Sequence, residues 1–163
     1  LIGGGLPVGA YGASAKIMSH ISPEGDVYQA GTLSGNPVAM SAGKATLVVL
    51  LKVGFYKGQN ERTEYFVNAL VSYAKEKEYQ FNIYNIGSIF WLAFRDNISI
   101  RKDSDIDSDS MKYFKKLHRA LLERGVYLGH SGFEVGFISS AHTREVLDVA
   151  IKVFKESLDI TFK

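Results

Sequence analysis

The chain has 163 residues, of which 46% are hydrophobic, and a formal net charge of +2. This composition is typical of a globular protein that can bury a sizeable core. Lys and Arg are scattered rather than interleaved with aromatics, which argues against a nucleic-acid partner, and no apolar run is long enough to span a bilayer. The lack of cysteine excludes disulfides, thiolate metal ligands and cysteine nucleophiles in this segment, and it favours a cytoplasmic location.

The first segment, LIGGGLPVGAYG, combines glycines and a proline with large apolar side chains. Glycine permits close backbone approach and positive φ, so we expect this segment to be held against neighbouring atoms. The apolar residues Leu6, Val8 and Tyr11 argue against the alternative, a mobile terminal loop. The spacing matches neither a Walker A loop nor the G-x-G-x-x-G fingerprint, which disfavours nucleotide binding.

Two helices are predicted in the first third of the chain. A short one covers residues 14–18 and is capped by Ser14. A longer one covers residues 37–52, with Gly54 as its C-terminal stop. The longer helix contains several small residues, which would let it pack close to neighbouring backbone.

The loop before the longer helix is the most informative part of the chain. Residues 31–40 read GTLSGNPVAM, in which a threonine lies between glycines and Asn-Pro opens the helix. Asn36 is a favourable N-cap, and Pro37 fits the first helical position. The hydroxyl of Thr32, backbone N–H groups and the helix N-terminus would then point at one place, which suits a phosphate ester. The alternative is a polar loop that only caps a helix.

The composition turns polar around residues 56–60, where we predict a boundary between two domains, 1–56 and 57–163. The second domain contains predicted helices and strands in the order expected for an α+β layer. The helices cover residues 61–79, 110–124 and the stretch after Thr143, and the strands lie within 81–95, 126–128 and 137–139. Apolar stripes predict the inward faces of the first and last helices, namely Phe66, Leu70, Tyr73 and Ala74, and Val146, Val149, Ala150, Val153 and Phe154.

No metal site is predicted. Residues 97–110 carry four Asp, but the glycine and terminal glutamate of an EF-hand are missing, so a solvated loop is expected. No pair of histidines has metal-ligand spacing. His142 is expected to form a local hydrogen bond, and His20 and His118 are expected at the surface.

A third run, residues 125–142, reads GVYLGHSGFEVGFISSAH, and residues 27–37 read VYQAGTLSGNP. Together with the first segment, these runs resemble the glutamate-1-semialdehyde aminomutase family, in collinear order over nearly the whole chain. That family belongs to the class III aminotransferase-like enzymes of fold type I, which use pyridoxal 5'-phosphate (PLP) or pyridoxamine 5'-phosphate. The resemblance implies an α/β fold in which residues 1–56 end the PLP-binding large domain and residues 57–163 form a small α+β C-terminal domain.

The resemblance also implies roles for individual residues. The family threonine that matches Thr32 hydrogen-bonds the PLP phosphate of the neighbouring subunit, which implies a homodimer, and Gly31 would add a backbone N–H. Tyr28 would line the entrance of the site. Glu134 would lie near the substrate, facing its amino group or an arginine, and its aromatic neighbours lead us to expect partial burial. The alternatives are that Tyr28 only packs and that Glu134 forms a structural salt bridge.

In the family, the lysine that forms the Schiff base with PLP lies immediately before the glycine-rich run, which here begins at Leu1. The resemblance therefore implies no catalytic lysine within these residues. It implies the C-terminal part of a cytoplasmic enzyme that isomerises glutamate-1-semialdehyde, a small molecule, to 5-aminolevulinate in tetrapyrrole (porphyrin) biosynthesis. The segment alone is expected to be inactive.

The third run departs from the family pattern at one place. Gly129-His130 replaces the usual Ala-Pro or Pro-Pro before the serine, which removes a rigid φ and adds a titratable ring. The exact substrate therefore stays open. Two other interpretations are a class III ω-aminotransferase of another amino substrate and a noncatalytic dimerisation or binding module.

Overall fold

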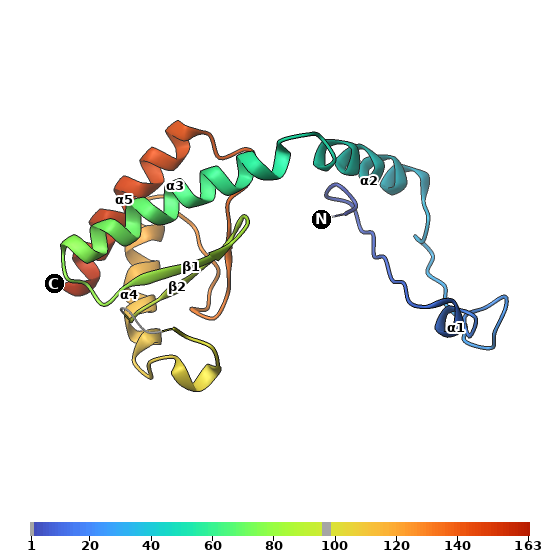
Figure 1. Ribbon diagram of the computed structural model, residues 1–163, viewed down its shortest axis with the longest axis horizontal. Coiled ribbons are helices and arrows are strands. Elements are labelled where there is room, and N and C mark those ends of the chain that lie inside the picture. The colour runs from blue at the N-terminus through green and yellow to red at the C-terminus, as the bar shows by residue number, and fades with distance from the viewer. Residues whose placement is uncertain (1, 96–98) are drawn as a thin grey trace. The chain divides into compact units, whose positions relative to one another are not determined.

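The computed structural model describes residues 2–95 and 99–163, and the chain divides into two compact units, Leu1–Phe55 and Tyr56–Lys163 (Figure 1). The helices are α1 (Ala15–Met18), α2 (Pro37–Leu50), α3 (Phe55–Glu76), the 3-10 turn η1 (Asp103–Asp105), α4 (Ser110–Leu122) and α5 (Arg144–Phe162). The strands are β1 (Asn82–Ile86), β2 (Ile89–Ala93) and β3 (Gly136–Phe137). Among the described residues no single helix could cross a bilayer; α2 and α3 reach the necessary length and apolar character only when counted together across the break between them.

In the first unit, the glycine-rich opening folds closely onto α2. A Cβ on Gly43 of α2 would lie 2.8 Å from the carbonyl oxygen of Ile2. A Cβ on Gly4, whose φ is +62°, would lie 2.7 Å from the hydroxyl of Thr46. Both positions therefore have no space for a side chain, and the positive φ of Gly4 is a second reason for glycine there. The expected close approach is confirmed at Gly4 but not along the whole segment, because a Cβ on Gly5, Gly9 or Gly12 would meet nothing within 4 Å and Tyr11 is 62% exposed.

Helices α1 and α2 form where the sequence predicts them. The side chain of Asn36 accepts a hydrogen bond of 2.9 Å from the backbone N–H of Ala39, which confirms its role as N-cap. Helix α2 ends at Leu50, slightly before the predicted end, and Gly54 follows with φ +84°. Ser14 precedes α1 without a side-chain hydrogen bond to it, so α1 is capped by backbone geometry alone.

The second unit packs α3, α4 and α5 with the antiparallel sheet β1-β2-β3 around one apolar core. Figure 1 shows α3 and α5 within this unit, and they meet where the rings of Phe66 and Phe154 lie 5.3 Å apart. Strands β1 and β2 confirm the strands predicted within residues 81–95, and they pair as an antiparallel hairpin from Asn82↔Ala93 to Ile86↔Ile89. Alternate side chains of β2 are fully buried, whereas Trp91 is only half-buried, so the other face of the strand is less covered than its apolar run predicts.

The polar residues 56–60, at which the sequence analysis places a domain boundary, form the first turns of α3. The side chain of Gln59 is buried, and its amide donates a hydrogen bond of 3.1 Å to the carbonyl oxygen of Ile138. A polar residue is therefore part of the packed interior because a distant segment supplies its partner. The helix also ends earlier than predicted, at Glu76.

Three further predictions in the second unit are corrected. Residues 126–128 do not form a strand. The carbonyl oxygen of Leu128 is hydrogen-bonded to the Nε2 atom of His118, at 3.2 Å, rather than to a neighbouring strand. The strand predicted at 137–139 is reduced to β3. On α5, Phe154 is buried and Ala150 and Val153 pack against the core as predicted, whereas Val146 and Val149 are exposed. The buried face also includes residues that the pattern does not predict, namely Leu147, Ile151 and Leu158.

The acidic loop before α4 uses its carboxylates locally, and residues 97 and 98 of that range lie outside the described residues. Asp103, Asp105 and Asp107 each accept a hydrogen bond from a nearby backbone N–H, at 2.7–3.0 Å. Asp109 pairs with Lys112 at 2.7 Å. These are the local turns that Asp side chains commonly stabilise.

Candidate functional site

The loop before α2 is shaped by two tight turns. The backbone N–H of Ser34 donates to the carbonyl of Gly31 at 2.9 Å, and that of Asn36 donates to the carbonyl of Leu33 at 3.3 Å. Gly35 has φ +70°, a conformation that glycine adopts without strain. These turns use the carbonyl oxygens of Gly31 and Leu33 and lead the chain from Thr32 into the N-terminus of α2.

Thr32 itself is exposed, and its hydroxyl has no hydrogen-bond partner within residues 2–95 and 99–163. The sequence from Asp26 to Glu61 contains no acidic residue between these two, so no nearby side chain along the chain opposes a negative charge. A free hydroxyl in a loop that leads directly into the N-terminus of α2 is the kind of donor that suits a phosphate ester. This placement is consistent with the predicted roles of Thr32 and Gly31.

The first two motifs lie against one hollow of the first unit. The cavity, about 670 Å³, is lined by Pro7 and Tyr11 of the glycine-rich segment and by Gln29 and Gly31 of the loop. The structure thus brings both segments together. Tyr28 does not line this cavity, and its side chain is 82% exposed, so it does not pack within this chain.

In the second unit, the loop over residues 129–137 is held from three sides. The indole N–H of Trp91 donates to the carbonyl of Gly132 at 2.7 Å. A Cβ on Gly132 would lie 3.0 Å from the ring of Phe114, and a Cβ on Gly136 would overlap the ring of Phe90. Two of the loop's glycines are therefore required by the aromatic side chains packed against them.

Glu134 sits in this loop, where its backbone N–H donates to the carbonyl of Ser131 at 3.0 Å. Its side chain is exposed rather than partly buried, because the adjacent Phe133 and Phe137 are themselves more than half exposed. The carboxylate is folded back over Gly129. Among the described residues, no cation pairs with it, so the structural salt bridge considered above is not formed within this chain.

Three of the histidines form hydrogen bonds with residues close to them in the sequence. The Nδ1 atom of His142 accepts a hydrogen bond of 2.9 Å from the backbone N–H of Ser139, which confirms the local role expected for it. His118 is half-buried rather than at the surface, while His20 is exposed as expected. The Nε2 atom of His130 lies 3.3 Å from the hydroxyl of Tyr127. Over residues 2–95 and 99–163, no three His, Asp or Glu side chains converge as metal ligands would.

One polar cluster was not predicted from the sequence. The hydroxyls of Tyr73 and Tyr79 both donate to the same carboxylate oxygen of Asp159, at 2.9 and 2.8 Å. Burial, followed by the bond to Asp159, raises the pKa of Tyr79 to about 12. The bond from Tyr79, with a smaller one from Tyr73, lowers the pKa of the Asp159 carboxyl. No local pattern could reveal this cluster, since its members are far apart in the chain.

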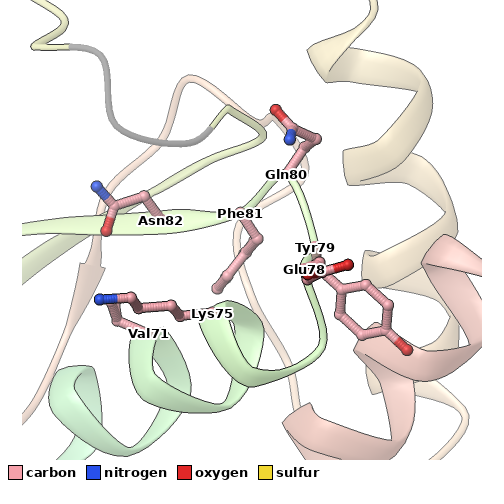
Figure 2. Close-up of a pocket in the computed structure, with 7 residues that line it drawn as sticks. All are labelled: Val71, Lys75, Glu78, Tyr79, Gln80, Phe81 and Asn82. Carbon is pink, nitrogen blue, oxygen red and sulfur yellow. The ribbon is translucent and has the colours of Figure 1, made fainter.

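Beside this cluster, a hollow of about 560 Å³ lies at the end of α3. Figure 2 shows Lys75 and Phe81 on one side of it and the Tyr79 ring pointing away, toward α5. Lys75 and Glu78 contribute charges of opposite sign. None of its lining residues belongs to the three sequence motifs; the tyrosine–aspartate cluster therefore contributes to stability rather than to the candidate site.

Known proteins share this sequence pattern and fold. The family model for aminotransferase class-III matches residues 1–155. An ω-transaminase from Sphaerobacter thermophilus is similar with a TM-score of 0.84 and 23% identity, over 99% of this chain and 37% of that chain. A structure described as a transaminase with PLP bound gives a TM-score of 0.80 and 25% identity, again over 99% and 37%.

A glutamate-1-semialdehyde aminomutase from Pseudomonas aeruginosa is also similar, with a TM-score of 0.69 and 18% identity over 90% of this chain and 33% of that chain. The chain therefore spans 33–37% of the length of these three solved structures. Because the family model covers nearly all of the chain and these structures share its fold, the chain belongs to the class III aminotransferases, which have the fold of type I PLP-dependent enzymes.

Proposed function

We propose that this chain carries the phosphate-holding loop and the C-terminal domain of a PLP-dependent glutamate-1-semialdehyde aminomutase. The observation that carries the proposal is the unbroken run VYQAGTLSGNP at residues 27–37, which forms an exposed turn at the N-terminus of α2. The collinear third run at residues 125–142 supports it. The product would be 5-aminolevulinate, for tetrapyrrole synthesis in the cytoplasm.

In this proposal the residues of the loop hold the cofactor phosphate. The Thr32 hydroxyl and the backbone N–H of Gly31 would donate hydrogen bonds to phosphate oxygens, and the N-terminus of α2 adds a favourable field. A hydrogen bond to a charged oxygen contributes about 1.5–3 kcal/mol. PLP, when bound, supplies the electron sink for moving the amino group, while the protein supplies position and charge.

Two exposed side chains are the proposed substrate contacts. Glu134 offers an exposed carboxylate, unpaired among the described residues, that could accept hydrogen bonds from the substrate's amino group or from an arginine of the complete protein. Tyr28 offers an exposed phenol a few residues before Thr32, and it would line the entrance of the site.

The proposed assembly is a homodimer in which Thr32 contacts the cofactor of the partner subunit. The exposure of Thr32 and its lack of a described partner support a role outside its own chain. Helix α2 and its end also carry apolar side chains that this chain leaves in solvent, among them Val38, Val48 and Leu51, which are 55–82% exposed. Apolar surface of this kind is commonly covered by further protein.

The experiment that tests the proposal compares two reactions of the complete protein containing these residues. Purified protein with PLP is given glutamate-1-semialdehyde, and 5-aminolevulinate is measured; separately, amino transfer to an external keto acid is measured. Rapid formation of 5-aminolevulinate without a keto acid supports the aminomutase. Amino transfer without such isomerisation overturns it, and the absence of both reactions, together with no bound PLP, indicates a noncatalytic module.

The second candidate is a class III ω-aminotransferase of another amino substrate. It is favoured by the higher TM-scores of the two transaminases, 0.84 and 0.80 against 0.69 for the aminomutase. The Gly129-His130 pair, which departs from the aminomutase pattern, also favours it. The same two assays separate the candidates, because a transaminase needs the external keto acid to complete its cycle.

A further inference from the structure

We propose that a hollow between the first turns of α3 and the start of α5 is a carboxylate-binding site in which Arg62 is the anchoring cation. The hollow measures about 480 Å³, and it is lined by Arg62 and Tyr65 of α3, by Ser140 and by Thr143 at the N-cap of α5. All of its lining residues belong to the second unit. The inference goes beyond the proposed function and does not rest on it, because it uses neither the phosphate loop nor Glu134.

Arg62 is held in place by a buried side chain. Its Nη1 atom donates a hydrogen bond of 3.2 Å to the Oε1 atom of Gln59, and the amide of Gln59 donates to the carbonyl oxygen of Ile138 at 3.1 Å. The Nη1 atom also lies close to Gly58, where a Cβ would come within 3.3 Å of it. Because Gln59 is buried and bonded at both of its polar ends, the guanidinium is oriented before any ligand binds. Most of its N–H donors are not used by the described residues.

The charge of Arg62 is not matched within the described part of the chain. None of the ion pairs among the described residues involves Arg62. The acidic residues that line the hollow have other partners. Glu61 pairs with Lys57 at 3.8 Å. The carboxylate of Glu145 is hydrogen-bonded by the Thr143 hydroxyl and, to a smaller extent, by its own backbone, which lowers the pKa of Glu145. A carboxylate from outside these residues would therefore be the ion partner of Arg62.

The second arginine of the hollow already has its partners. The guanidinium carbon of Arg144 lies 3.3 Å from the ring centroid of Tyr65, and its Nε atom lies 3.5 Å from the Oδ1 atom of Asp148. The same Oδ1 atom accepts a hydrogen bond from the Tyr65 hydroxyl. Arg144 therefore forms a wall of the hollow with its charge matched. The hydroxyl of Ser140 has no partner among the described residues, and it adds a neutral donor to the same hollow.

These groups favour a carboxylate over other anions. A guanidinium presents parallel N–H donors that match the two oxygens of a carboxylate, and such charge-assisted hydrogen bonds are the stronger kind. Glu61 and Glu145 are also among the lining residues, and their charges disfavour a doubly charged phosphate more than a singly charged acid. The carboxylate would come from a free small acid or from an acidic side chain of the complete protein, because this chain spans only 33–37% of the length of the similar structures.

The test compares Arg62→Gln with Arg119→Gln in the complete holoenzyme, because Arg119 is an exposed arginine of the same unit that lies outside the hollow. Melting temperatures are measured in sodium chloride and in sodium acetate or phosphate of equal ionic strength. If the ligand is a free acid, acetate raises the melting temperature of the wild-type and Arg119→Gln proteins with half-saturation on the order of 10 mM, the affinity expected of one charged contact. Arg62→Gln then abolishes this increase.

If the carboxylate instead belongs to the complete protein, acetate adds nothing. Arg62→Gln then lowers the melting temperature by about 5 °C in either salt, whereas Arg119→Gln lowers it by about 1 °C or less. Arg62→Lys, which keeps the charge but loses the planar fork, should retain only part of either effect. A crystal structure of the complete protein grown with acetate should show a carboxylate bonded to the Arg62 guanidinium and identify its source.

Three results would each overturn the inference. The first is that Arg62→Gln and Arg119→Gln have equal melting temperatures and respond equally to acetate. The second is an increase that depends on Arg62 and is larger with phosphate than with acetate. The third is a crystal structure in which the Arg62 guanidinium has no carboxylate partner. None of these readouts uses activity, so the carboxylate site and the proposed function can stand or fall separately.

Discussion

The indole N–H of Trp91 donates a hydrogen bond of 2.7 Å to the carbonyl oxygen of Gly132. This bond connects β2, which belongs to the core sheet, with the loop that carries Glu134. The Trp91 ring also stacks against Tyr84 of β1, with ring centroids 6.1 Å apart, so its orientation is set from the strand side. The position of the candidate substrate loop thus depends on a side chain of the rigid sheet, which is the arrangement that a precise site requires.

Replacing Trp91 with Phe should therefore affect both stability and substrate binding. The variant keeps an aromatic ring on β2 but leaves the Gly132 carbonyl without its donor, which costs about 1–2 kcal/mol in the free energy of unfolding. Because Glu134 loses part of its support, KM for the amino substrate should rise several-fold while kcat changes less. Urea unfolding and steady-state kinetics measure the two effects. Phe133→Leu, an exposed change in the same loop, is the control, and an unchanged KM in Trp91→Phe would show that the loop positions itself.

Removing the Thr32 hydroxyl should weaken cofactor retention without affecting the fold. Thr32→Val keeps the shape of the side chain but loses the donor, and a bond to a charged oxygen contributes about 1.5–3 kcal/mol, so the Kd for PLP should rise about ten- to a hundredfold. The melting temperature of the cofactor-free protein should not change, because the hydroxyl has no partner among the described residues. Equilibrium dialysis of PLP gives the Kd. Thr32→Ser, which keeps a hydroxyl, should retain most of the affinity, and equal Kd values for all three proteins would contradict the role of Thr32.

The Tyr79–Asp159 pair should make stability depend on pH at both extremes. The pKa of Asp159 is lowered in the folded protein, above all by the Tyr79 hydroxyl, so the stability it contributes is present above the ordinary pKa of an aspartate and is lost as the pH falls below about 4. The pKa of Tyr79 is raised from 10.0 to about 12 by burial and by Asp159, so its contribution is present below pH 10 and is lost as the pH rises toward 12.

The variant that checks this pair is Asp159→Asn, measured by urea unfolding at pH 3, 7 and 11. At pH 7 it should cost about 1–2 kcal/mol, because two hydrogen bonds to a charged, partly exposed group become neutral ones. At pH 3 the cost should shrink, because the stability that comes from the lowered pKa of the carboxyl begins to be lost below the ordinary pKa of an aspartate. Glu156→Gln, an exposed change on the same helix, is the control for the loss of one charge. A cost that stays the same at pH 3 and pH 7 would mean that the ionised carboxylate is not what the tyrosines stabilise.

Two helices of the second unit end in the same turn with different residues at the left-handed position. After α3, Tyr79 N–H donates to the carbonyl of Ala74 at 2.9 Å, and Glu78 between them has φ +58°. After α4, Val126 N–H donates to the carbonyl of Leu121 at 2.9 Å, and Gly125 has φ +82°. Both are Schellman turns, but only the second has the glycine that this conformation favours.

Exchanging these residues should therefore shift the free energy of unfolding in opposite directions. Glu78→Gly should stabilise the protein by about 1 kcal/mol because glycine adopts the left-handed conformation without the strain that a Cβ causes. Gly125→Ala should destabilise the protein by about the same amount for the opposite reason. Thermal unfolding of the two variants gives the comparison. Destabilisation by Glu78→Gly would indicate that the carboxylate contributes more to the turn than its backbone conformation costs.

The same two turns illustrate what sequence patterns can predict. Gly125 directly follows the helix predicted over residues 110–124 and is the usual residue for such a stop, whereas the turn at Glu78 follows no local rule, and the predicted helix of residues 61–79 extends beyond the observed end at Glu76. The polar composition around Gln59 indicates a domain boundary but not its burial, because its hydrogen-bond partner, Ile138, is 79 positions away. Polar residues buried by distant partners cannot be recognised from local composition.

At the candidate site, sequence motifs predict the local structure of the loops but not the burial of their side chains, which depends on tertiary packing. The loop at Thr32 could be predicted because the N-cap, the first-turn proline and the glycine turn all lie within a few residues. The environment of Glu134 could not, since its burial depends on whether Phe133 and Phe137 face the interior, and both lie at the surface. The room at Gly129 depends equally on a side chain whose direction no sequence rule specifies.

The buried hydroxyls of α5 give a final prediction, because two of them one turn apart should behave oppositely. Ser157 is fully buried, and its hydroxyl has no partner among the described residues. Thr161 is also buried, but its hydroxyl donates to the carbonyl of Ser157 at 2.7 Å. An unpaired buried hydroxyl costs about 1–3 kcal/mol, whereas a satisfied one contributes about 1 kcal/mol. Ser157→Ala should therefore raise the free energy of unfolding and Thr161→Val should lower it, both measured by urea unfolding at pH 7. A loss of stability in Ser157→Ala would mean that an ordered water satisfies the hydroxyl.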